Sequence, residues 1–116
     1  MSEPQAILDQ VFEVSKFVRY AALYRRDNLV SRQRAEIAGA SSNESDRYEE
    51  LFINPTLLTL VRQRGNVDCG GAQFVVVRYG NFYQLVISLT DGHVSVCFEL
   101  LANPLEYAER IRDICE

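Results

Sequence analysis

A chain of 116 residues, 47% of them hydrophobic and 24% charged, is long enough to bury a core of its own. This composition excludes a fibrous or disordered protein, and no apolar run approaches the roughly 20 residues that span a membrane. The formal net charge of −4 argues against wholesale nucleic-acid binding, which needs a basic surface. The first residues do not form a basic segment followed by an apolar one, so no secretion signal is predicted and we expect the protein in the cytoplasm.

The N-terminal segment predicts a helix capped by Ser2, with Pro4 in its first turn. Its apolar stripe has helical spacing and consists of Ile7, Leu8, Val11 and Val14. Residues 17–24 and 29–34 then favour two strands, joined by a turn at 26–28 because Asp and Asn tolerate turn geometry. Residues 35–43 are rich in Ala, Gly and Ser and predict a loop.

The middle of the chain predicts a helix that begins near Ser45 and ends at Gly65. The pair Asn54 and Pro55 predicts a break or kink inside it, with Asn54 capping the second piece.

Three strand-like runs follow, over residues 72–79, 82–90 and 93–100. Their connections predict two-residue turns at 80–81 and 91–92, and therefore an antiparallel meander. One face of this meander is expected to be core, and its predicted residues are Tyr83, Leu85, Ile87, Leu89, Val94, Val96, Phe98 and Leu100.

The last segment predicts a helix with Asn103 as its cap, Pro104 at its first position and Glu106 completing a capping box. Its predicted apolar stripe consists of Leu105, Ala108, Ile111 and Cys115. The whole chain is thus expected to be one α+β domain with a five-stranded antiparallel sheet and the order helix, two strands, helix, three strands, helix.

This order, over nearly the whole chain, resembles the roadblock family, which is named for a dynein light chain and includes bacterial regulators of small Ras-like GTPases. Residues 20–31 resemble the first hairpin of that family, and residues 74–100 resemble its three-strand meander. The resemblance implies a profilin-like fold with strand order 2-1-5-4-3. It also places the first and last helices on one face of the sheet and the central helix on the other.

In that order, residues 73–79 form an exposed edge strand that is apolar on both faces and has no proline. Bare apolar edges invite pairing with another chain. The resemblance implies that this edge pairs with its copy in a homodimer, with the central helices in contact across it. The predicted interface consists of Phe74, Val75, Val76, Val77, Arg78, Tyr79, Leu57, Leu58 and Val61. The alternative left open by the residues is a central strand buried in a monomer.

Basic residues gather near the first hairpin, and those singled out are Arg25, Arg26, Arg32 and Arg34. Their charge either blocks unwanted pairing of an edge strand or receives an acidic partner surface or a phosphate-bearing ligand. Nucleic acid is the least favoured partner.

The sequence contains few of the motifs that indicate a catalytic site. The sequence has neither a phosphate-binding glycine loop nor a Gly-x-Ser-x-Gly or His-Glu-x-x-His motif. Cys69 beside two glycines, with His93 as a base, is the best pair available, and it requires two loops to meet. The three cysteines, Cys69, Cys97 and Cys115, have no metal-binding or disulfide pattern.

We therefore expect no cofactor and no metal site. The favoured function is that of a non-enzymatic homodimeric interaction module. The resemblance implies that it regulates, or acts as a scaffold for, a small Ras-like GTPase or another signalling partner, and that the protein is bacterial. The alternative is a sensor domain that encloses a small ligand between sheet and helix.

Overall fold

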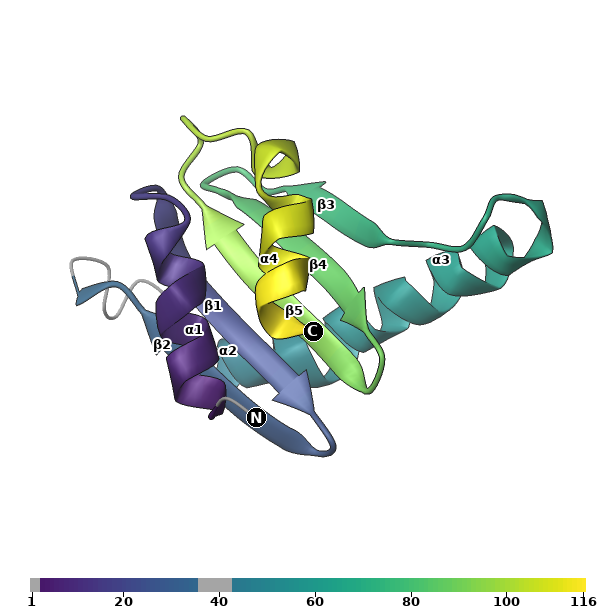
Figure 1. The fold of residues 1–116 in the computed structure, drawn as a ribbon, viewed down its shortest axis with the longest axis horizontal. Helices are drawn as coiled ribbons and strands as arrows, with labels where there is room; N and C mark the ends of the chain where they lie inside the picture. The colour runs from purple at the N-terminus through teal and green to yellow at the C-terminus, as the bar shows by residue number, and fades with distance from the viewer. Residues whose placement is uncertain (1–2, 36–42) are drawn as a thin grey trace.

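The computed structural model describes residues 3–35 and 43–116, and Figure 1 shows a five-stranded antiparallel sheet between two layers of helix. The strands are β1 (Val18–Arg25), β2 (Asn28–Gln33), β3 (Phe74–Arg78), β4 (Tyr83–Leu89) and β5 (Gly92–Phe98). Their order is β2-β1-β5-β4-β3, which confirms the predicted topology. On one face lie α1 (Pro4–Glu13) and α4 (Ala108–Cys115), and on the other α2 (Asn43–Tyr48), η2 (Glu49–Ile53) and α3 (Asn54–Asp68).

The main core lies between the sheet and the pair α1 and α4. Alternate residues of β4 and β5 point into it, and Leu85, Ile87, Val96 and Phe98 are at most 1% exposed. The helices contribute, among others, Leu8 with no exposed surface. Two predicted core positions are wrong, because Leu100 and Leu105 lie in the segment after β5 and are 39% and 61% exposed.

The central helix is not broken at Pro55. Residues 43–68 stay helical, and the backbone at Asn54 has φ −64° and ψ −45°. The wider π-helical turn η2 lies immediately before the proline, and the Asn54 N–H donates to the Glu49 carbonyl, five residues back. A proline lacks an N–H and crowds the carbonyl four residues before it, so a π turn at this place accommodates it. The predicted cap role of Asn54 is also wrong, because its side chain bonds to Glu50.

The helix passes its predicted end as well and continues from Gly65 to Asp68. A Cβ at Gly65 would lie 2.9 Å from the Ala72 nitrogen, so the glycine allows the returning chain to pass close to the helix. Gly70 and Gly71 then turn the chain with φ of 79° and 85°, values that favour glycine.

Both hairpin turns next to the central strands differ by one residue from the prediction. The first contains only Arg26 and Asp27, with φ of 49° and 65°, because Asn28 already pairs with Arg25. Positive φ at both central positions is the type I′ geometry that suits tight hairpins. The turn between β4 and β5 is Thr90 and Asp91, since Gly92 pairs with Leu89.

The first helix and the last helical segment were each predicted to begin at a capping side chain. Ser2, the predicted first cap, and most of the predicted 35–43 loop lie outside the described residues. Glu3 precedes α1 without a side-chain cap bond. Near the C-terminus, Asn103 is a helix cap as predicted, because its Oδ1 accepts from the Leu105 N–H at 3.2 Å. The element that it caps is a short 3₁₀ turn, η3 (Pro104–Glu106), and α4 begins after that turn.

Candidate functional site

The predicted interface strand is an edge of the sheet. β3 pairs with β4 on one side, and within the described residues no strand pairs with its other side (Figure 1). Residues 74–77 are each partly exposed and apolar, and Arg78 is exposed. β3 therefore has no proline, bulge or inward charge of the kind that protects many edges.

The hydrogen-bond pattern shows which backbone groups are open. The Tyr79 N–H donates to the Phe82 carbonyl at 2.9 Å, and the Ser88 N–H donates to the Gln73 carbonyl at 3.4 Å. Because antiparallel pairs alternate, odd-numbered residues of this strand bond to β4 and even-numbered residues direct N–H and C=O to the open side. The open groups therefore belong to Phe74, Val76 and Arg78.

The residues that the central helix exposes differ from those that were predicted for the interface. Leu57 and Val61 are half-buried, but Leu58 is 1% exposed and so has no surface to offer a partner. The helical segments on this face expose other large apolar residues that the sequence reasoning did not select. These residues are Tyr48, Phe52, Leu60 and Val67, each at least 58% exposed.

The four predicted arginines do not form one cluster. Arg25 and Arg26 share Asp91 at the tip of the hairpin, with N–O distances of 2.9 and 3.1 Å. Arg32 bonds to Asp9 on α1, also at 2.9 Å. Arg34 lies at the opposite end of the sheet, because β2 runs away from the hairpin tip. Strand spacing thus separates residues that are close in sequence.

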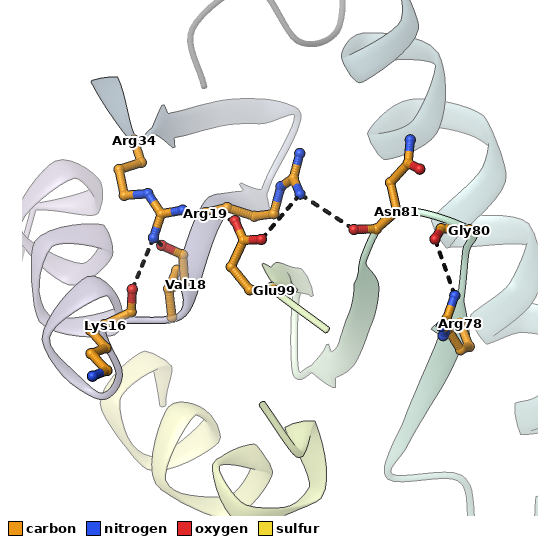
Figure 2. A network of polar contacts seen from close by, with 8 residues as sticks. All are labelled: Lys16, Val18, Arg19, Arg34, Arg78, Gly80, Asn81 and Glu99. Atoms are coloured by element: carbon orange, nitrogen blue, oxygen red, sulfur yellow. Dashed lines mark hydrogen bonds and ion pairs between the residues drawn. The ribbon is translucent and has the colours of Figure 1, made fainter. Parts of the chain in front are cut away.

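The structure instead gathers a different basic group, shown in Figure 2 and called here the basic end: Lys16, Arg19, Arg34 and Arg78. The strand registers bring the start of β1 and the ends of β2, β3 and β5 to the same end of the sheet. Glu99 is the acid of this network, 2.7 Å from Arg34 and 3.6 Å from Arg19. Arg34 also donates to the Lys16 carbonyl at 2.9 Å, so part of its role is structural.

A buried polar cluster lies between η2 and the sheet. The Glu50 side chain has no exposed surface, and its Oε1 lies 2.8 Å from His93 Nε2 and accepts from Asn54 Nδ2 at 3.0 Å. Its Oε2 accepts from the Tyr20 hydroxyl at 3.2 Å. The Tyr24 ring stacks on His93 with centroids 5.7 Å apart. These bonds join the π turn to two central strands and satisfy a carboxylate that would otherwise be costly to bury.

Beside this cluster is an open pocket of about 480 Å³ between the helical layer and the sheet. Its closed end is formed by Glu50, Gln84 and Cys97, which are buried, and exposed Gly80 and Asn81 lie at its mouth. The acidic side chains in its wall are Asp46, Glu49 and Glu50, and the aromatic ones are Tyr20, Tyr79 and Phe82.

Burial changes the acidity of several groups here. It raises the pKa of Tyr20 well above the ordinary value, with a further contribution from Glu50, and it raises the pKa of the Cys97 thiol. Burial and the bond to Glu49 raise the pKa of Tyr79 to about 12. The pKa of Glu49 is also raised, mainly by burial, although the Tyr79 hydroxyl donates to it at 3.0 Å. Tyr20, Tyr79 and Cys97 are therefore protonated at neutral pH.

The proposed catalytic pair is not assembled. Cys69 is exposed at the end of α3, whereas His93 is 2% exposed and bonds to Glu50. Cys97 and Cys115 are buried free thiols. Over residues 3–35 and 43–116, no group of three or more His, Cys, Asp or Glu side chains is placed to hold a metal ion. No helix in these ranges is long and apolar enough to cross a membrane.

The arrangement is therefore that of an α+β domain with an open sheet edge, a basic end and an acidic pocket. Comparison of the sequence with models of known protein families gives no match, and comparison with curated proteins gives none either.

The Glu50 cluster and the pocket were missed by sequence reasoning, since Tyr20, Glu50 and His93 are far apart in the chain. The one available signal was a tyrosine among the apolar residues of β1.

Proposed function

We propose that the protein is a non-enzymatic interaction module that acts as a homodimer. The observation that carries this proposal is the open β3 edge, with apolar side chains on both faces and backbone groups at Phe74, Val76 and Arg78 that no strand among the described residues pairs with. Antiparallel pairing of two such edges joins two sheets into one and satisfies these groups.

The outer surface of the central helix supports the same proposal. Figure 1 shows α3 extending past the β3 edge. In the proposed dimer, the second subunit lies on that side. Phe52 and Leu60 are 61% and 58% exposed, and large apolar side chains exposed together are typical of interaction surfaces. Sedimentation equilibrium of the purified chain tests the proposal: a concentration-independent monomer at micromolar protein contradicts it.

We further propose that the dimer regulates, or acts as a scaffold for, a small Ras-like GTPase or another signalling partner. This step depends on the resemblance to the roadblock family, and the basic end supplies a surface for it. Guanidinium groups pair well with carboxylates, so the matching surface of the partner is acidic. Lys16 is the exposed member that lies outside β3, whereas Arg78 belongs to that edge strand and Arg34 is tied to its own chain.

Charge reversal tests the partner surface. The tagged protein is expected to capture, from its native cell, a protein that binds a fluorescent guanine nucleotide. Lys16→Glu should abolish capture while sedimentation still reports the dimer, because Lys16 lies outside β3. The matched control, Arg110→Glu, makes the same change of charge away from the basic end and should retain capture. Equal capture by both variants contradicts this surface.

A second candidate, a small-ligand sensor, is favoured by the pocket of about 480 Å³. This volume lies within the usual range of ligand sites, about 300–1,000 Å³. A rise in melting temperature with a member of a metabolite and nucleotide panel supports this function, and a flat panel together with GTPase capture favours the interaction module.

A further inference from the structure

The pocket beside the Glu50 cluster has features that indicate what kind of ligand it takes. Of its acidic residues, Glu50 is fully used by His93, Asn54 and Tyr20. Glu49 is different, because it is partly exposed in the pocket wall and its hydrogen-bond partners, the Tyr79 hydroxyl and the Gln84 side-chain amide, are both neutral. Its negative charge thus has no cationic partner in the ion pairs formed by the described residues.

Arg19, the one basic side chain that the described part of the chain places in the wall, does not offset this charge. Arg19 lies at the mouth with Asn81 in Figure 2, where its guanidinium bonds to the Asn81 carbonyl and pairs with Glu99 at 3.6 Å. It also lies over the Phe82 ring, 5.2 Å from the centroid. The wall therefore keeps an excess of negative charge, and it contains an aromatic face that accepts a guanidinium in this structure.

A second observation comes from the floor of the pocket. Gln84 is 2% exposed, and its Nε2 donates to Ser95 Oγ at 2.9 Å. Among the described residues, no donor reaches its Oε1. A buried acceptor without a donor costs free energy, and a hydrogen-bond donor on a ligand removes that cost.

We infer that this pocket binds a planar organic cation of the amidinium or guanidinium class, with the Glu49 carboxylate as its charge partner and the Gln84 amide oxygen as a further acceptor. Such a cation presents several N–H donors in one plane and stacks on aromatic rings such as that of Tyr79, which lies in the wall and, unlike Phe82, carries no guanidinium of the described residues. Burial raises the pKa of Glu49 because it disfavours the charged form, and a cation beside the carboxylate favours that form. This inference deepens the sensor function and depends on it, but it is independent of the homodimer.

The test compares benzamidine, a planar cation, with benzamide, its neutral counterpart, by calorimetric titration of the full chain. Benzamidine should bind with saturation at one site per chain, and benzamide should bind about 10-fold or more weakly. Glu49→Gln should lower the affinity for benzamidine by about 10-fold or more and leave benzamide unchanged. The amide oxygen introduced by this substitution still accepts from the Tyr79 hydroxyl, so the variant is expected to fold. Glu44→Gln is the matched control, because it removes the same charge from an exposed position outside the pocket wall.

Three outcomes overturn the inference: no saturable benzamidine binding at millimolar concentration, equal binding of benzamide, or equal affinity of the Glu49→Gln and Glu44→Gln variants. If the metabolite panel then yields a neutral or anionic ligand, the sensor function survives and only the cation is wrong. Where benzamidine binds as expected, agmatine and a blocked Ala-Arg-Ala tripeptide identify the source. Tighter agmatine supports a free small molecule, and a tighter tripeptide supports an arginine side chain of a partner protein.

Discussion

Tyr20→Phe tests whether the buried Glu50 cluster holds the helical layer on the sheet. The substitution removes a hydroxyl that donates to Glu50 Oε2 at 3.2 Å and leaves the ring, which is 8% exposed. A hydrogen bond to a charged group contributes about 1.5–3 kcal/mol. Since 1 kcal/mol shifts the melting temperature of a domain of this size by about 4 °C, we expect a loss of about 6–12 °C.

Tyr24→Phe is the matched control, because its hydroxyl also bonds to a carboxylate at 3.2 Å, that of Asp27, but on the exposed hairpin turn. Exposed pairs of this kind contribute little, so the control should lose less than about 0.5 kcal/mol. Urea unfolding at one fixed protein concentration measures both variants, since the stability of a dimer depends on concentration. Equal losses for the two variants would refute the idea that the buried cluster stabilises this layer.

Two further predictions concern pH and a close backbone contact. Tyr79 ionises at its ordinary pKa of 10.0 in the unfolded chain and at about 12 in the fold, so the unfolded state loses its proton first and the free energy of unfolding falls as pH rises across this interval. Tyr79→Phe should make that fall shallower in urea titrations, and an unchanged slope contradicts the assignment. Gly92→Ala should destabilise by about 1–3 kcal/mol, since its Cβ would meet the Tyr24 carbonyl oxygen at 1.8 Å. Gly80→Ala, where a Cβ has nothing within 4 Å, is the control and should be nearly neutral in thermal melts.

The topology was predictable because local signals agreed with one another. Alternating apolar residues and short polar turns indicated the meander, and Asn103 and Pro104 indicated where the last helical segment starts. The helix through Pro55 was not predictable from the local rule, which counts only the missing N–H and the clash in an α-helix. A π turn accommodates the proline, and here it carries Glu50, whose carboxylate bonds to Tyr20 and His93 in the sheet.

The candidate sites were less predictable than the fold for a similar reason. The edge strand followed from the topology, but the helix residues that face outward did not, because the sequence predicted a break at Pro55 whereas the helix continues through it. The arginines of the first hairpin are near one another in sequence, but β2 leads from Arg25 and Arg26 at the turn to Arg34 at the other end of the sheet. Arg19 and Arg34 meet through Glu99, whose position depends on the pairing of β1 with β5.

The central claim, pairing through β3, is tested most directly by proline at a position whose N–H points to the open side. Val76→Pro removes that N–H without removing a hydrogen bond to β4. The control, Val76→Ala, loses similar side-chain packing but keeps the N–H. Arg78→Pro repeats the test at an exposed side chain. Sedimentation equilibrium of the wild type and Val76→Ala should give twice the chain mass of 13.2 kDa, and both proline variants should give the monomer. Folded proline variants that keep the dimer mass, or a monomeric wild type, would contradict the account.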